Sequence, residues 1–133
     1  MKKAYWMAIY KEIKNPENIK KYAEKATPAI QKYKGKILSI DNSTEFLAIA
    51  EKYWKIAKVE KKIKSIIGQG IDVLNNFINK KIYFDLIFID ADKNHYIDYY
   101  ESSINLINKD GLIIIDNTLW GGDVLNRNDK SSK

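Results

Sequence analysis

Short apolar runs alternate with amphipathic helical patterns along most of this chain, and this alternation narrows the possible folds more than any other feature. The clearest run is FDLIFID at residues 84–90, whose nearly continuous apolar side chains suit a central strand covered on both faces. Repeated strand and helix patterns of this kind are typical of parallel sheets with crossover helices. We therefore predict an α/β fold with an open, mainly parallel sheet of about five strands and helices on both faces.

The boundaries of these elements follow from the turn and capping signals between them. After the second strand, Asn42 with Glu45 three residues later forms a capping pattern that predicts the start of a helix. Lysine, aspartate and glycine at 109–111 predict a turn before the last strand. The chain is predicted to form a single domain over residues 1–133, with 123–133 as a flexible tail. The five predicted strands lie at residues 4–13, 36–41, 62–67, 83–90 and 111–116.

Length and composition exclude several classes of protein. A chain of 133 residues, 45% hydrophobic and 30% charged, is suited to one globular domain. The absence of cysteine excludes a disulfide scaffold, a thiolate metal site and a cysteine nucleophile. No apolar run approaches the roughly 20 residues that span a bilayer, so we expect a soluble cytoplasmic protein that does not enter a membrane. The net charge of +6 comes mostly from lysines spread singly along the chain, which favours a solvated surface over a dedicated nucleic-acid face.

Polar residues or glycine follow four of the predicted strands. Asp41 and Asp90 end the second and fourth strands, Gly68 follows the third, and Asp116 ends the fifth with Asn117 directly after it. Parallel strands bring their carboxyl ends to one edge, where open α/β sheets bind ligands. We therefore predict a ligand site at this edge.

Asp90, Asp116 and Asn117 offer two carboxylates and an amide oxygen. An all-oxygen set suits a hard cation such as Mg²⁺, Mn²⁺ or Ca²⁺, whereas zinc favours histidine or thiolate ligands, and His95 is the single histidine. The alternative is that each aspartate caps the helix or turn after its strand. From the residues alone, both interpretations stay open.

Three other positions have a functional and an ordinary interpretation. Asp41 lies where a nucleoside-binding fold places a carboxylate for ribose hydroxyls, although helix capping competes with that role. The Gly68–Gly70 turn, with Gln69 at its centre, would let backbone approach a flat ring, but a strand-to-helix turn needs glycine equally. Lys93 would lie beside any cation held at Asp90, where positive charge and partial burial lower a lysine pKa towards general-base values. An exposed surface lysine is the ordinary interpretation of the same residue.

Two long stretches of the chain resemble a known family. FDLIFIDADKNHYIDYYE and LINKDGLIIIDNTLWGG resemble the signature of cation-dependent, S-adenosylmethionine-using O-methyltransferases of the caffeoyl-CoA and catechol type. The preceding GKILSIDNSTEFLAIAEKYWKIAKVEKKIKSIIGQGIDVL is similar to the same family, so the resemblance covers about residues 35–122. It implies a Rossmann-like, truncated class I methyltransferase core. The resemblance also implies roles for individual residues: the divalent cation on Asp90, Asp116 and Asn117, the methyl donor along Asp41, Gln69, Gly70 and Asp90, and Lys93 as the base.

The ends of the chain depart from that family. Its first strand leads into a glycine-rich loop around the methionine part of the donor, whereas AYWMAIYKEIKNPENI contains no glycine. Residues 1–38 instead resemble the opening of a small ferredoxin-like α/β family of unknown function, with K-x-Y-W and ATPAIxKYxGKxL. The chain also stops soon after the second motif. We therefore interpret it as a chimaera or a fragment of a methyltransferase gene.

The leading functional hypothesis is methyl transfer from S-adenosylmethionine to a cation-chelated hydroxyl of a small aromatic acceptor with vicinal hydroxyls. One alternative keeps this chemistry and takes a hydroxylated tRNA uridine as the acceptor. Another is a non-catalytic α/β domain that pairs with a partner or with itself as a homodimer; the glycine-free first loop favours it. Measuring donor binding with and without magnesium separates these classes.

Overall fold

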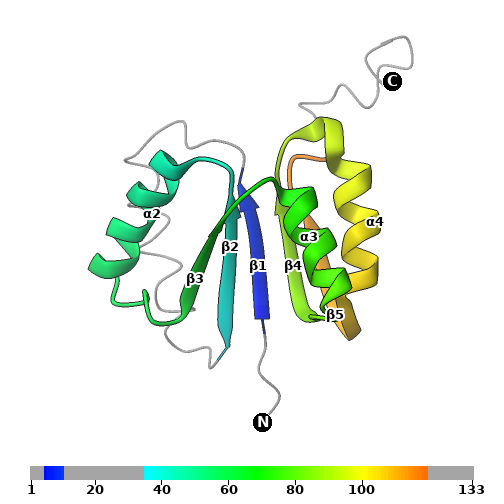
Figure 1. Ribbon diagram of the computed structural model, residues 1–133, viewed down its shortest axis with the longest axis horizontal. Coiled ribbons are helices and arrows are strands. Elements are labelled where there is room, and N and C mark those ends of the chain that lie inside the picture. The colour runs from blue at the N-terminus through cyan, green and yellow to red at the C-terminus, as the bar shows by residue number, and fades with distance from the viewer. Residues whose placement is uncertain (1–4, 11–34, 120–133) are drawn as a thin grey trace.

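The computed structural model describes residues 5–10 and 35–119. The strands within these residues form one open sheet in the order β3-β2-β1-β4-β5 (Figure 1). Every pair of neighbouring strands is parallel. The predicted open, parallel α/β class is therefore confirmed. The strands are β1 (Tyr5–Tyr10), β2 (Lys36–Asp41), β3 (Ile63–Ile67), β4 (Phe84–Asp90) and β5 (Ile107–Ile115).

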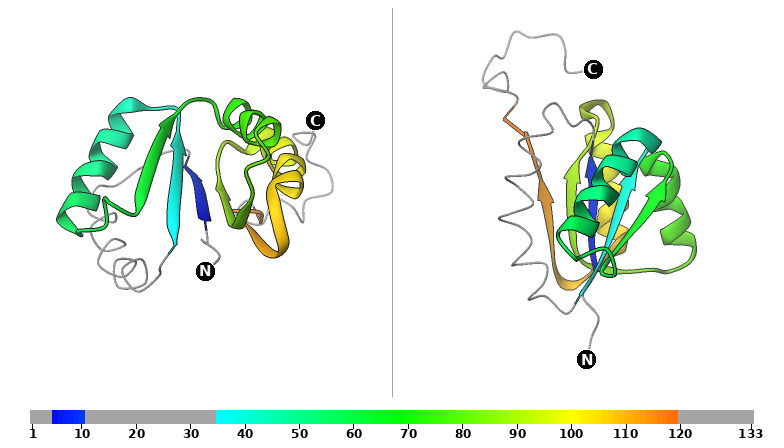
Figure 2. Two further views of the ribbon diagram at one scale, coloured as in Figure 1. Left: turned by 60° about the horizontal axis from the view of Figure 1, so that its bottom comes forward. Right: turned by 90° about the vertical axis from the view of Figure 1, so that its left-hand side faces the viewer.

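Helices connect these strands on both faces of the sheet. The helices are α2 (Thr44–Ile56), α3 (Gly70–Asn79), the short 3₁₀ helix η1 (Lys93–His95) and α4 (Tyr96–Leu106). The Ser65 hydroxyl of β3 donates to Oε1 of Glu51 in α2 at 2.8 Å, whereas the neighbouring Ile66 packs against the core beneath α3 and α4. Successive side chains of a strand point to opposite faces, so α2 lies on one face and α3 and α4 on the other. Figures 1 and 2 show α3 and α4 side by side.

The main hydrophobic core lies between the sheet and the pair of helices α3 and α4. Phe77 of α3 and Phe84 of β4 meet there with ring centroids 5.4 Å apart and planes tilted by 54°. Leu106, the last residue of α4, is fully buried in the same cluster. This packing holds the start of α3 and the loop after β4 in fixed relation. The buried cluster consists of Ile40, Leu74, Phe77, Phe84, Ile87, Ile89, Ala91, Tyr99 and Leu106.

Two predicted boundaries were wrong. The last strand begins at Ile107, directly after α4, because residues 109–111 form an irregularity within the β4–β5 pairing, with Asp110 at a φ of 66°, and not a turn before the strand. The helix after β2 is capped by Ser43, whose Oγ accepts the Phe46 amide at 3.3 Å, and not by Asn42.

The N-terminal segment is described only over β1. This strand pairs in parallel with β2 on one side and β4 on the other, so it lies at the centre of the same sheet as the remaining strands. The rest of the predicted strand 4–13, the glycine-free loop at 11–16 and the predicted tail 123–133 lie outside the described residues. Within the described residues, no helix has the length and apolar character needed to cross a membrane.

Candidate functional site

The strand ends that the sequence singled out lie at one edge of the sheet. Asp41 and Asp90 are the last residues of β2 and β4, Gly68 follows β3, and Asp116 follows β5. Because all the strand pairs are parallel, their carboxyl ends share an edge. The predicted convergence of these positions at one edge is therefore observed.

Asp90, Asp116 and Asn117 lie together on the β4 and β5 side of this edge. Burial raises the pKa of Asp90 and the charge of Asp116 raises it further, while a side-chain hydrogen bond from Asn117 and the charge of Lys93 act in the opposite direction. The Asp116 amide donates to the Ile89 carbonyl at 2.9 Å, which ties the end of β5 to β4. Asn117 has a left-handed φ of 55°, and its amide donates to Oδ1 of Asp116 at 2.7 Å. Two acidic groups thus repel each other beside an amide.

This set fits a hard divalent cation by its chemistry. Positive charge between Asp90 and Asp116 would relieve their repulsion, and the Asn117 side chain supplies a neutral oxygen, a ligand type that Mg²⁺, Mn²⁺ and Ca²⁺ accept. Among residues 35–119, no three acidic or histidine side chains gather in a metal-binding group. Any cation here would therefore depend on the amide as well as the two carboxylates.

Two side chains, one from η1 and one from the first residue of α4, hold the backbone of this pair. Lys93 Nζ donates to the Asn117 carbonyl at 3.3 Å, and the Tyr96 hydroxyl donates to the Asp116 carbonyl at 3.1 Å. Burial raises the pKa of Tyr96, and the charges of Asp90, Asp116 and Asp92 raise it further, so the hydroxyl keeps its proton and remains a donor. Lys93 therefore lies beside the candidate cation ligands, where the sequence placed it.

Asp41 and the glycine turn form a second group on the β2 and β3 side. Asp41 is buried, and its Oδ1 accepts the Ser43 amide at 2.7 Å. Burial raises the pKa of Asp41, with the amides of Ser43 and Asn42 opposing that rise. The Gly68 amide donates to the Asp41 carbonyl at 3.0 Å, so the turn after β3 is tied to the end of β2. Gln69 is exposed and Gly70 is the buried first residue of α3.

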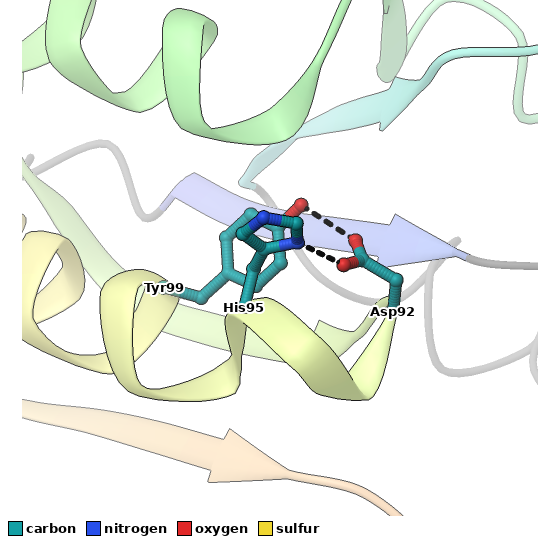
Figure 3. A network of polar contacts seen from close by, with 3 residues as sticks. All are labelled: Asp92, His95 and Tyr99. Atoms are coloured by element: carbon teal, nitrogen blue, oxygen red, sulfur yellow. Dashed lines mark hydrogen bonds and ion pairs between the residues drawn. The ribbon is translucent and has the colours of Figure 1, made fainter. Parts of the chain in front are cut away.

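A third group, which the sequence did not indicate, lies between these two. The carboxylate of Asp92 accepts the Tyr99 hydroxyl at 3.0 Å through Oδ1 and meets Nδ1 of His95 through Oδ2 (Figure 3). Burial acts to raise the pKa of Asp92, but its hydrogen bonds with His95 and Tyr99 outweigh burial and the pKa is lowered. The one available signal was their spacing, which places all three near one face of a turn and helix.

Comparison with known proteins decides the family. The O-methyltransferase family matches residues 20–133. The chain belongs to the O-methyltransferase family. The match begins at residue 20, inside the segment 1–38 whose sequence resembles the opening of a different family, so residues 20–38 fall within the methyltransferase match.

Individual relatives of this O-methyltransferase chain agree with that assignment. It is 38% identical over 93 residues to caffeoyl-CoA O-methyltransferase of Stellaria longipes, covering 68% of this chain and 39% of the relative. Caffeoyl-CoA O-methyltransferase 2 of Populus trichocarpa is 39% identical over 94 residues, covering 68% of this chain and 38% of the relative. The chain thus spans about two fifths of the length of these relatives.

Solved structures share the fold. The O-methyltransferase of Bacillus cereus in complex with S-adenosylhomocysteine superposes with a TM-score of 0.76 at 23% identity, covering 95% of this chain and 55% of that one. TomG of Streptomyces achromogenes in complex with S-adenosylmethionine gives a TM-score of 0.75 at 19% identity, with 95% and 54% covered. At these identities the likeness shows the fold alone.

The single histidine of this O-methyltransferase chain permits a direct test of the Asp92 group. The hydrogen bond to Asp92 raises the pKa of His95 above the usual 6.5, and the negative charge of Asp92 adds to the rise. We expect Asp92→Asn to return the His95 pKa to its usual range, with NMR of the imidazole as the measurement. The pairing should therefore be fully present below pH 6.5 and lost as the pH rises through the folded-state pKa. Asp98→Asn is the control, because the charge of Asp98 raises the pKa of His95 less; equal His95 pKa values in wild type and Asp92→Asn would contradict the pairing.

Proposed function

We propose that this chain is part of a divalent-cation-dependent O-methyltransferase that moves a methyl group from S-adenosylmethionine to a hydroxyl of a small aromatic acceptor with vicinal hydroxyls. The observation that carries the proposal is the convergence of Asp90, Asp116 and Asn117 beside Lys93 at the carboxyl edge of the sheet. The relatives named for caffeoyl-CoA methylation support this class of acceptor. Family membership favours an enzyme over a non-catalytic domain.

In this proposal Asp90, Asp116 and Asn117 hold Mg²⁺, or Mn²⁺ or Ca²⁺ in its place. When bound, the cation would lower the pKa of a chelated acceptor hydroxyl and fix its oxygen for in-line displacement. Lys93 would accept the remaining proton of that hydroxyl at Nζ. The side chains of Lys93 and Tyr96 donate to the backbone carbonyls of Asn117 and Asp116 and so keep this pair in place.

The donor would lie along the other half of the edge, on Asp41, Gln69 and Gly70, with Asp90 between the two halves. The complexes of the structural neighbours with S-adenosylmethionine and S-adenosylhomocysteine support this donor. A carboxylate has about four acceptor positions, so the bonds from Ser43 and Asn42 leave Asp41 able to accept ribose hydroxyls as well.

We expect this chain to bind the donor weakly and to turn over slowly or not at all. Residues 11–16, KEIKNP, replace the glycine-rich loop in sequence, and side chains there would obstruct the close approach of backbone amides to the methionine carboxylate. Losing a few charge-assisted hydrogen bonds, at about 1.5 to 3 kcal/mol each, would weaken binding about a hundredfold or more.

Calorimetry with S-adenosylhomocysteine, with and without Mg²⁺, tests the proposal, followed by a methyl-transfer assay on catechol. A tRNA carrying hydroxyuridine serves as the second acceptor and separates the two acceptor classes. Donor binding that tightens with Mg²⁺ would support the proposal, and no binding at millimolar concentration would contradict it. Micromolar affinity with ordinary turnover would instead contradict the expected weakness of the donor site.

A further inference from the structure

The ring of Tyr99 fills the space beside Gly70 that a side chain would otherwise occupy. A Cβ atom placed on Gly70 would lie 2.7 Å from Cε1 and 3.1 Å from the hydroxyl oxygen of Tyr99, both too close for an ordinary contact. Tyr99 has only 4% of its surface exposed. Tyr99, the fourth residue of α4, therefore packs directly on Gly70, the first residue of α3.

The same Tyr99 is bonded to the loop that follows β4. Its hydroxyl donates to Oδ1 of Asp92 at 3.0 Å, and the second oxygen of that carboxylate meets His95 (Figure 3). Asp92 is two residues beyond Asp90, and the intervening Ala91 is buried in the core. Because both oxygens of the carboxylate are engaged, the Tyr99 hydroxyl has a partner of fixed orientation.

Tyr99 thus joins two segments that are distant in sequence. On one side it contacts Gly70, which directly follows Gln69 in the turn after β3. On the other side it bonds the loop between Asp90 and Lys93. Because the hydroxyl alone bonds Asp92, it can be removed while the ring that contacts Gly70 is kept.

We propose that Tyr99 is a positioning residue that sets the spacing between the Gly68–Gly70 turn and the end of β4 that carries Asp90. The inference rests on the proposed function, in which the turn would hold the donor and Asp90 would hold the cation. Methyl transfer depends on the relative placement of donor and acceptor. Tyr99 contacts Gly70 of the turn directly, so a change at Tyr99 should weaken donor binding more than cation binding. Tyr99 itself contacts no reacting atom.

The test uses Tyr99→Phe in the full chain, which removes the hydroxyl and keeps the ring. The Val73 amide donates to the Gln69 carbonyl at 3.1 Å and so reports on the turn in the ligand-free protein. We expect its hydrogen exchange to accelerate at least about threefold. The dissociation constant for S-adenosylhomocysteine should rise about tenfold, the equivalent of one hydrogen bond to a charged group. Mn²⁺ affinity without the donor should change less than about twofold.

Tyr100→Phe is the matched control, because Tyr100 is the next residue and is 45% exposed. It should change neither exchange nor binding. Asp92→Ala removes the carboxylate that accepts the Tyr99 hydroxyl, so it should reproduce the effect of Tyr99→Phe, and the double variant should be no worse than Asp92→Ala alone. Losses that add would instead show that Tyr99 and Asp92 act independently, which would contradict the inference.

Two outcomes separate this inference from the proposed function. If wild type binds the donor and Tyr99→Phe changes neither Val73 exchange nor donor affinity, the positioning role is wrong while the function stands. If wild type does not bind the donor at all, the proposed function is wrong. Exchange at Val73 then decides whether Tyr99 sets the turn, and unchanged exchange overturns that role as well.

Discussion

Asp90→Asn should weaken divalent-cation binding by at least about a hundredfold. The substitution removes one of the two carboxylates in the candidate site and leaves Asp116 and Asn117 to bind alone. Changes to groups that merely support metal ligands cost 10- to 100-fold in affinity, so loss of a charged ligand should cost at least as much. Titration with Mn²⁺ in the absence of donor, followed by calorimetry, measures the effect without depending on activity.

Asp85→Asn is the matched control, because it changes the same residue type in the same strand at the opposite end. Asp85 accepts the Asn108 side chain at 3.0 Å, and an asparagine oxygen can accept the same bond. Its cation affinity should stay within about twofold of wild type. Equal losses in Asp85→Asn and Asp90→Asn would show that any binding reflects net charge and not the site.

The same Asp90→Asn substitution should raise the stability of the cation-free protein, although it lowers cation affinity. Burial and the nearby charge of Asp116 raise the pKa of Asp90, so the ionised group is less stable in the folded chain than in the unfolded one. Neutral asparagine removes this penalty at pH 7, and the midpoint of urea unfolding should rise. A variant that is more stable without metal yet binds it less well would identify Asp90 as a group retained for binding.

The sequence was sufficient for features that depend on local pattern. β2 was predicted with its observed bounds, and the apolar run of β4 indicated a strand inside the sheet because its residues are covered on both faces. The polar strand ends could be placed at one edge because parallel pairing dictates it. Neither inference required knowledge of which distant residues meet.

Features that depend on distant partners could not be predicted. The early start of β5 at Ile107 arises from an irregular pairing with β4, and the sequence around Asp110 looks like an ordinary turn. The contact between Tyr99 and Gly70 exists because α3 and α4 pack side by side, which no local pattern encodes. The Asp92 group was missed for the same reason, since its tyrosine reads as one more apolar position of α4.

Phe84→Ala should lower the free energy of unfolding by about 3 to 5 kcal/mol, the cost of removing a large buried side chain and leaving a cavity. Phe84 is fully buried at the start of β4, and its ring packs on Phe77 of α3. Domains of this kind have a free energy of unfolding of about 5 to 15 kcal/mol, so the loss of this one side chain would remove a large share of that free energy. Urea unfolding followed by circular dichroism measures the loss.

Tyr83→Ala is the matched control for this change, because the neighbouring tyrosine is 47% exposed and its removal should cost no more than about 0.5 kcal/mol.

Phe84→Ala should also affect ligand binding at the candidate site. Phe77 anchors the same helix whose first residue, Gly70, contacts Tyr99, so loosening α3 at Phe84 should disturb the donor side of the edge. The bonds that hold Asp116 and Asn117 come from η1, α4 and β4 and do not involve α3. In conditions where Phe84→Ala remains folded, donor affinity should therefore fall more than Mn²⁺ affinity, and an equal fall in both would show that the two halves of the edge are not separately supported.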